Sequence, residues 1–344
     1  MASAPPLRVV VADDSAFMRR LLADALGKSG FRVVATVEDG DQALRASTAL
    51  SPDVLTLDLA MPGLDGIGVL KAMREAGSVV PVVVVSAFSP AHGARAVDAL
   101  AEGAVDLVAK PAAGEDLNGF LAELAEKVQL AAASHPGRPA NGRVAPPLVR
   151  QRAVRRPGRP RTVVIACSTG GPRALAELIP QLPSPLGAGT VVVQHMPAGF
   201  TGSLAARLDR ASGLSVREAA AGDALEPGTV LIAPGGLHLR LDDKGAARLS
   251  DEPAIGGLRP RADLTIADAA RVFGSDLLLV VLTGMGKDGL DGAREVRRGG
   301  GTVLAEAEST CTVYGMPRAV VEAGLADGVH ELPKLAAAIA AEAG

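Results

Sequence analysis

The N-terminal third of the chain alternates short apolar runs with longer amphipathic segments. The runs are LRVVVADD, FRVVATV, DVLTLDL, VVPVVVVSA and VDLVAKP, and the stretches between them are long enough for helices that cross from strand to strand. Five such units predict a parallel sheet covered by helices on both faces. Residues 7–130 are therefore expected to form a doubly wound α/β domain.

Apolar runs resume at residue 162 and continue to the end of the chain. They read TVVIAC, GTVVVQH, LSVREAA, TVLIAPG, DLLLVVLTG and GTVLAEAE, and most are separated by helical lengths. This pattern predicts a second wound parallel sheet, a Rossmann-like α/β domain over residues 162–344. The segment HLRLDDKGAARLS alternates apolar residues around a charged turn with Gly245, which predicts a small antiparallel hairpin.

Residues 131–161 separate the two domains and have a different composition. They are rich in Pro and Gly and contain eight arginines and no acidic residue. Such a segment is typical of an extended connector without a packed core. Two interpretations remain open: a self-repelling solvated tether, or an arginine-rich segment that contacts an acidic partner or holds one domain against the other.

Composition narrows the functional classes. Aromatic residues make up only 2% of the chain and tryptophan is absent, so no surface for stacking nucleic-acid bases is expected, and the net charge of −3 predicts no general attraction to nucleic acid or anionic lipid. Two cysteines do not form a disulfide framework. With no signal-peptide pattern and no apolar run of about 18 residues, we expect a soluble cytoplasmic protein that does not insert into membranes.

Polar residues gather at the carboxyl ends of the first group of strands. Asp13 and Asp14 end the first strand, Asp58 the third, Ser86 the fourth and Lys110 the fifth. Three acids at one sheet edge repel one another unless a cation neutralises them, and oxygen ligands suit Mg²⁺. A carboxylate beside Mg²⁺ can attack a phosphoryl donor, with Lys110 and Ser86 holding the new phosphoryl oxygens. Taken singly, each acid would be a helix cap or a loop residue.

The second group of strands ends in a different set. Ser168 follows the first strand in VVIACSTGGP, His195 follows the second, and Asp288 lies just beyond LTGMGKDG. A serine, a histidine and an aspartate can serve as nucleophile, base and orienting acid if the fold brings them together. Thr169 and Met285 are candidates for backbone donors to an oxyanion.

Each of these residues also has a structural interpretation. The serine before two glycines could be a turn residue, a helix cap or part of an anion site. His195 could be a structural histidine and Asp288 a cap for the helix that begins near Gly289. Cys167 is a rival nucleophile, although its position predicts a side chain that points into the sheet.

The N-terminal constellation, with ADDS, LDLAMPGLDG and AKP, resembles the receiver domain of two-component response regulators. The resemblance implies a flavodoxin-like fold, Asp58 as phosphoacceptor, a histidine kinase as phosphodonor and a cis peptide bond before Pro111. It also implies a Mg²⁺ site built from Asp13, Asp14 and Asp58. Leu107 stands where many receivers have a large aromatic residue.

The C-terminal segments ACSTGGPRAL, VVVQHMPAGFTGSLAARLD, IAPGGLHL, LRPRAD, VLTGMGKDGLDGA and YGMPRAVVEAG resemble the catalytic domain of chemotaxis response regulator protein-glutamate methylesterases. The resemblance implies a Ser168–His195–Asp288 triad, with the Met285 backbone in the oxyanion hole. Its implied substrates are glutamate γ-methyl esters on methyl-accepting chemoreceptors, with deamidation of receptor glutamine as a further activity and phosphorylation as the activating signal. No cofactor is expected for the hydrolysis itself.

This chain departs from the family pattern at two places. Ala166 replaces the usual glycine two residues before the serine, and Arg261 and Ala262 replace the usual Ser-Val. A different class of function, a phosphorylation-controlled DNA-binding regulator that uses the arginine-rich segment, is disfavoured because no helix-turn-helix pattern is present. A hydrolase with a different client protein is the nearer alternative.

Overall fold

The protein is described from a computed structural model that covers residues 5–87, 90–111, 116–134 and 160–344. The chain divides into two compact units, Met1–Arg138 and Pro139–Gly344, and each is described by itself. Most of the predicted connector over 131–161 lies outside the described residues, so its two interpretations stay predictions.

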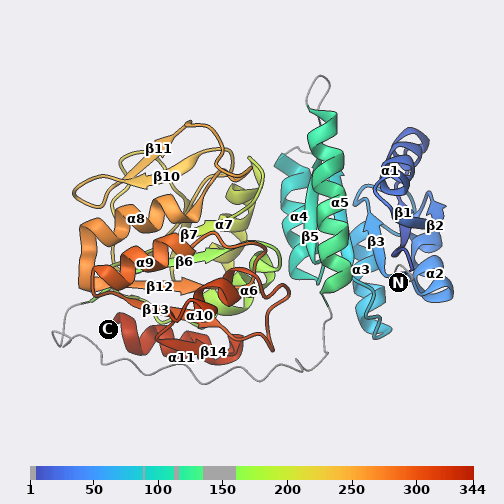
Figure 1. The fold of residues 1–344 in the computed structure, drawn as a ribbon. Coiled ribbons are helices and arrows are strands. Elements are labelled where there is room, and N and C mark those ends of the chain that lie inside the picture. Colours follow the sequence, from blue (N-terminus) through green and yellow to red (C-terminus); the bar gives the residue numbers. More distant parts are fainter. Residues whose placement is uncertain (1–4, 88–89, 112–115, 135–159) are drawn as a thin grey trace. The chain divides into compact units, whose positions relative to one another are not determined.

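The N-terminal unit is built around a parallel sheet in the order β2-β1-β3-β4-β5 (Figure 1). The strands are β1 (Arg8–Ala12), β2 (Arg32–Val37), β3 (Val54–Leu57), β4 (Val82–Ala87) and β5 (Asp106–Lys110). The helices are α1 (Ala16–Lys28), α2 (Gly40–Leu50), α3 (Gly66–Glu75), α4 (Pro90–Ala101) and α5 (Leu117–Ala133). This strand order confirms the predicted doubly wound, flavodoxin-like fold.

Helices cover both faces of this sheet, as its continuous apolar strands require. Helix α1 packs beside α5, whereas α2, α3 and α4 pack in a row. Leu107, at the position of the expected aromatic residue, is buried in β5. The structure has cis peptide bonds before Pro185 and Pro260 but not before Pro111, so the expectation of a cis bond there is wrong.

The C-terminal unit contains a larger sheet and a separate hairpin. Its strands are β6 (Thr162–Cys167), β7 (Gly189–Gln194), β8 (Ser215–Glu218), β9 (Thr229–Ile232), β10 (His238–Leu241), β11 (Ala247–Ser250), β12 (Leu277–Val281), β13 (Thr302–Glu306) and β14 (Gly328–His330). Its α-helices are α6 (Gly171–Leu178), α7 (Phe200–Ala211), α8 (Ala262–Phe273), α9 (Leu290–Arg298), α10 (Met316–Glu322) and α11 (Leu332–Ala343). Two short 3-10 helices, η1 (Ile179–Gln181) and η2 (Gly274–Asp276), complete it.

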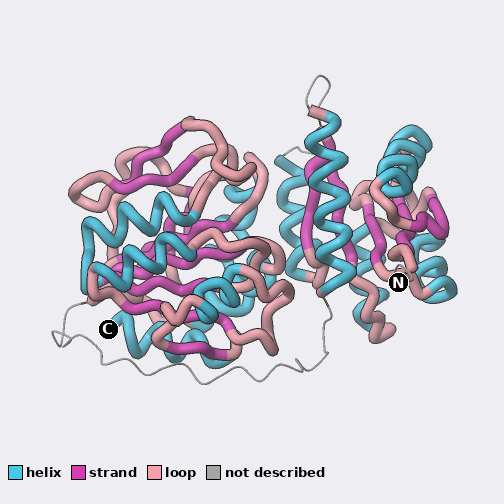
Figure 2. The backbone as a smooth tube through the Cα atoms, in the orientation of Figure 1, coloured by secondary structure: helices cyan, strands magenta, loops and turns pink. Residues whose placement is uncertain are grey.

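The larger sheet has the order β14-β13-β12-β6-β7-β9-β8, and all its strand pairs are parallel. Helices flank it on both sides (Figure 2). Strands β10 and β11 form the predicted antiparallel hairpin, with Gly245 in its turn. Strand β14 was not predicted, because its three partly exposed residues form no apolar run.

Strand β6 is the point in the sheet at which the order of strand addition reverses. From β6 the chain builds outward through β7 on one side, and it later returns to place β12 on the other. In open α/β sheets, ligands bind beyond the carboxyl ends of the strands at such a switch point. The corresponding point in the N-terminal unit lies between β1 and β3.

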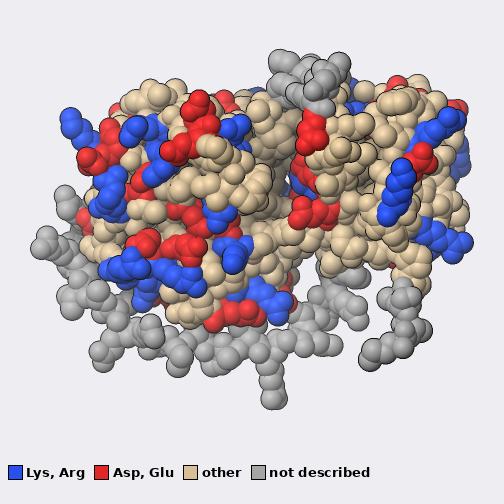
Figure 3. Space-filling model, turned by 45° about the horizontal axis from the view of Figure 1, so that its top comes forward, with Lys and Arg blue, Asp and Glu red and all other residues tan. Residues whose placement is uncertain are grey.

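The surface is charged but mixed in sign. On the face that Figure 3 shows, acidic and basic side chains of the C-terminal unit are interspersed. Among this unit's ion pairs, Arg240 contacts Asp268 and Arg297 contacts Asp327. Among the residues that the structure describes, none of the helices combines the length and the apolar composition of a transmembrane span.

Apolar side chains buried in the C-terminal sheet contribute to the free energy of unfolding of this unit. Leu279 is fully buried in β12, between β6 and β13. We expect Leu279→Ala to lower the free energy of unfolding by about 2–5 kcal/mol, because it removes apolar contacts and leaves a cavity. Chemical denaturation measures this loss, with Ile255→Ala at an exposed apolar residue as the control. Equal losses in the two variants would contradict the packing described here.

Candidate functional sites

Ser168 lies at the switch point of the C-terminal sheet. Strand β6 pairs on one side with β7, where Cys167 is opposite Gln194, and on the other with β12, where Ala166 is opposite Val281. The Ser168 N–H donates to the Thr283 carbonyl just beyond the end of β12, at 3.0 Å. The serine therefore sits between the segments that follow β7 and β12.

The chain turns sharply after Ser168 because two glycines allow it. Gly170 has φ of +79°, and a Cβ built on it would lie 2.4 Å from the side chain of Thr312. A Cβ on Gly171 would lie 2.0 Å from Gln194 Oε1. Larger residues at either position would push the neighbouring segments away. Gln194 Nε2 donates to the Ser168 carbonyl at 3.0 Å, which ties the turn to the end of β7.

His195 and Asp288 are in direct contact. His195 Nε2 lies 2.7 Å from Asp288 Oδ2, and both side chains are largely buried. Asp288 Oδ2 also accepts the Ala262 N–H at 2.7 Å. Because an ionised carboxylate can only accept, His195 Nε2 is the donor in this contact, and in the neutral tautomer that carries this proton the lone pair lies on Nδ1.

Asp288 is held by the N-terminus of α8, and not only by its own helix. Its Oδ1 accepts the N–H groups of Asp263 at 2.9 Å and of Gly289 at 3.0 Å. Burial opposes ionisation of Asp288, but the hydrogen bond and charge of His195, together with the α8 N–H groups, outweigh it and hold the pKa of Asp288 well below its ordinary value. The expectation that Asp288 caps the helix after Gly289 is therefore wrong: Gly289 is the N-cap of α9 and has no side-chain capping bond, and Asp288 instead accepts N–H groups at the start of α8.

The remaining predicted residues surround the serine. Ser168 is partly exposed, Thr169 is buried and Met285 is exposed. A Cβ on Gly284, next to Met285, would lie 2.8 Å from Ser168 Cβ, so this segment packs directly against the serine. In the part of the chain that the structure describes, no hydrogen bond joins Ser168 Oγ to His195. Such bonds are often long before substrate binds.

Cys167 does not fit the role of nucleophile. Its side chain is fully buried, with Sγ 3.1 Å from Gln194 Oε1, and burial raises the pKa of the thiol. A protonated, inaccessible thiol is a poor nucleophile.

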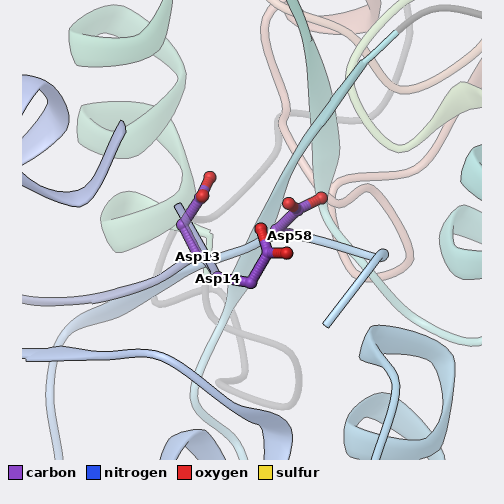
Figure 4. A group of neighbouring side chains, drawn as sticks. All are labelled: Asp13, Asp14 and Asp58. Atoms are coloured by element: carbon purple, nitrogen blue, oxygen red, sulfur yellow. The ribbon is translucent and has the colours of Figure 1, made fainter. Parts of the chain in front are cut away.

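The N-terminal unit gathers its acids at its own switch point. Asp13, Asp14 and Asp58 come from the ends of β1 and β3 (Figure 4), and each offers an oxygen within 4.8 Å of the others. Lys110 Nζ lies 2.6 Å from Asp58 Oδ2 and 2.7 Å from Asp13 Oδ2. Ser86 is buried at the end of β4, and its Oγ donates to the neighbouring carbonyl of Ala87.

The acidic cluster fits a divalent cation. Asp13 and Asp58 are almost completely buried, and Asp14 is exposed. Asp13 Oδ2 has its ion pair with Lys110 but, among the described residues, no hydrogen-bond donor. Burial raises the pKa of Asp13, although Lys110 acts against it. An oxygen with unfilled lone pairs beside two further carboxylates is a suitable ligand set for a hard cation.

Several residues that shape these sites were not predicted. Thr283, Gln194 and Glu306 are polar residues at or just beyond the ends of apolar strands, the same signal that identified Ser168. Arg261 was noted only as a departure from the family pattern. Its Nη2 lies 2.9 Å from Asp263 Oδ2, and its Nε lies 3.5 Å from Asp288 Oδ1, so it adds a positive charge beside the aspartate.

Known proteins resemble this chain over nearly its whole length. Residues 163–339 match the CheB methylesterase family, and residues 9–122 match the response regulator receiver domain. A protein of Symbiobacterium thermophilum named protein-glutamate methylesterase/protein-glutamine glutaminase is 46% identical over 97% of this chain and 96% of its own length. A Thermotoga maritima protein of the same name is 42% identical over 94% of both chains.

A solved structure agrees with the fold of the C-terminal unit. The crystal structure of the Thermotoga maritima CheB methylesterase catalytic domain matches with a TM-score of 0.51 and 46% identity, covering 54% of this chain and 99% of that one. The chain therefore belongs to the protein-glutamate methylesterase/protein-glutamine glutaminase family, with a response regulator receiver domain ahead of its CheB methylesterase domain.

Proposed function

We propose that the C-terminal unit hydrolyses glutamate γ-methyl esters on methyl-accepting chemoreceptors, with Ser168 as nucleophile, His195 as base and Asp288 as orienting acid. The observation that carries the proposal is the 2.7 Å contact between His195 Nε2 and Asp288 Oδ2, at the sheet edge where Ser168 emerges. The relatives' shared name supports the substrate class.

In the proposed reaction, Ser168 Oγ attacks the ester carbonyl and His195 Nδ1 takes its proton. Asp288 holds the Nε2–H tautomer and stabilises the imidazolium that forms. Met285 N–H, which has no acceptor among the described residues, and Thr169 N–H are the proposed donors to the oxyanion.

His195 then returns the proton to the leaving oxygen, and methanol departs. A water molecule, deprotonated by His195, attacks the Ser168 acyl ester and releases the receptor glutamate. A glutamine side chain would follow the same route with ammonia as the leaving group, which agrees with the glutaminase part of the relatives' name.

We further propose that phosphorylation of Asp58 activates the hydrolase. A histidine kinase would supply the phosphoryl group in the cytoplasm, and Mg²⁺ held by Asp13, Asp14 and Asp58 would neutralise charge during the transfer. Lys110, 2.6 Å from Asp58, would contact the new phosphoryl oxygens. Shifting the chain from about 1% to about 99% of an active state would take about 5.5 kcal/mol. We therefore expect phosphorylation to shift this equilibrium only in part, and to raise the rate of hydrolysis above a measurable basal rate.

The first test is methanol release from membranes that carry methylated chemoreceptors. Ser168→Ala should lower the rate by about 10⁴-fold or more, and His195→Ala by about 10²–10⁴-fold. Ser275→Ala, an exposed serine at the amino end of β12, is the matched control and should keep the wild-type rate. Undiminished release by Ser168→Ala would exclude this nucleophile.

The second test asks whether phosphorylation of Asp58 activates the hydrolase. A small phosphodonor with Mg²⁺ should raise methanol release by the intact chain and leave Asp58→Asn at its basal rate, because the acceptor carboxylate is gone. Asp53→Asn, at the amino end of β3 and remote from the cluster, should respond like wild type. Equal stimulation of wild type and Asp58→Asn would show that phosphorylation acts elsewhere.

A further inference from the structure

Glu306 is a fully buried carboxyl group that the proposed reaction does not use. It ends β13, the strand beside β12, and its side chain is 0% exposed. Its Oε2 accepts the Thr283 N–H at 2.8 Å, whereas Oε1 has no hydrogen-bond partner among the described residues. A buried carboxyl with an unsatisfied oxygen costs stability, so its presence calls for a specific role.

Glu306 binds Thr283, the residue that links the end of β12 to the turn at Ser168 and Thr169. The Thr283 carbonyl accepts the Ser168 N–H at 3.0 Å, and Thr283 Oγ1 donates to the Thr169 carbonyl at 3.0 Å. Thr283 Oγ1 also accepts the Val313 N–H at 3.0 Å. Every polar atom of Thr283 is therefore engaged, and the bond to its N–H comes from Glu306 on the neighbouring strand β13.

The residues after Thr283 pack directly on the nucleophile. Gly284 is so close to Ser168 that a Cβ there would lie 2.8 Å from Ser168 Cβ, and Met285 follows at once. A shift of Thr283 away from β13 would therefore move the Met285 N–H relative to Ser168. Small displacements of an oxyanion donor have large effects on rate.

We propose that Glu306 is a positioning residue, which accepts the Thr283 N–H and thereby holds residues 283–285 against Ser168 so that the Met285 N–H meets the oxyanion. This inference rests on the proposed function, because it assigns Glu306 to the same hydrolytic site. It requires only the hydrogen-bond acceptor at Oε2, so a glutamine that keeps a carbonyl oxygen in the same place should serve.

The experiment compares Glu306→Gln, which keeps the acceptor, with Glu306→Met, which keeps the length and removes it. We expect Glu306→Met to lower kcat by about 10–100-fold with KM unchanged, and Glu306→Gln to stay within about threefold of wild type. Asp327→Leu is the matched control, because it likewise replaces a side-chain acceptor by an apolar group of similar size: Asp327 accepts the Val303 N–H near the opposite end of β13, so this variant should affect stability and not kcat.

A second readout does not depend on the receptor substrate. The rate at which a fluorophosphonate labels Ser168, followed by mass spectrometry of the intact protein, should fall in Glu306→Met in parallel with kcat. A Glu306→Met chain with wild-type kcat and labelling, or a Glu306→Gln chain as slow as Glu306→Met, would overturn the inference. If Glu306→Met does not fold, Glu306→Asp retracts the acceptor while keeping the acid, and an unchanged kcat there would likewise overturn it.

Wild type and Ser168→Ala in the same assays separate this inference from the proposed function. If the wild-type chain is labelled at Ser168 but releases no methanol, the receptor ester is excluded as its substrate. The labelling rates of the Glu306 variants would still test the positioning role of Glu306. A wild-type chain that does neither would remove the proposed function and this inference together.

Discussion

The pairing of β6 with both β7 and β12 is the constraint on which the C-terminal unit depends. It brings three chain segments that are distant in sequence to one sheet edge: the turn at Ser168, the residue His195 after β7, and the segment from Thr283 to Asp288 after β12. Because backbone hydrogen bonds fix the register of parallel strands, these segments meet with little freedom. The candidate residues are thus held by the central, hydrogen-bonded strands of the sheet.

Charges and hydrogen-bond donors stabilise the carboxyl groups that the two sheets bury at their edges. Asp288 is buried, yet it is ionised because the N-terminus of α8 and His195 surround it with donors. In the N-terminal unit, the buried carboxyl groups of Asp13 and Asp58 are instead stabilised by ion pairs with Lys110. In both units, hydrogen-bond donors or an opposite charge offset part of the cost of burying carboxyl groups at the switch point of a parallel sheet.

Much of this arrangement could be predicted from the sequence because it is local. Apolar runs identified every long strand among the described residues, and polar residues at their ends made Ser168, His195 and the receiver acids candidates for the two sites. Other features depend on contacts between remote segments: Asp288 is held by Ala262 in a different helix, and Glu306 meets Thr283 across two strands. No local pattern encodes such pairs. Strand β14 was missed because three half-exposed residues carry no periodic signal.

In the proposed reaction, hydrolysis passes through a covalent ester at Ser168. Its most direct test is mass spectrometry of the intact chain, acid-quenched during turnover of a methylated chemoreceptor fragment. We expect a receptor fragment joined to Ser168, formed with loss of methanol, and no such species in Ser168→Ala. An adduct on another residue, or methanol release at the wild-type rate by Ser168→Ala, would contradict it.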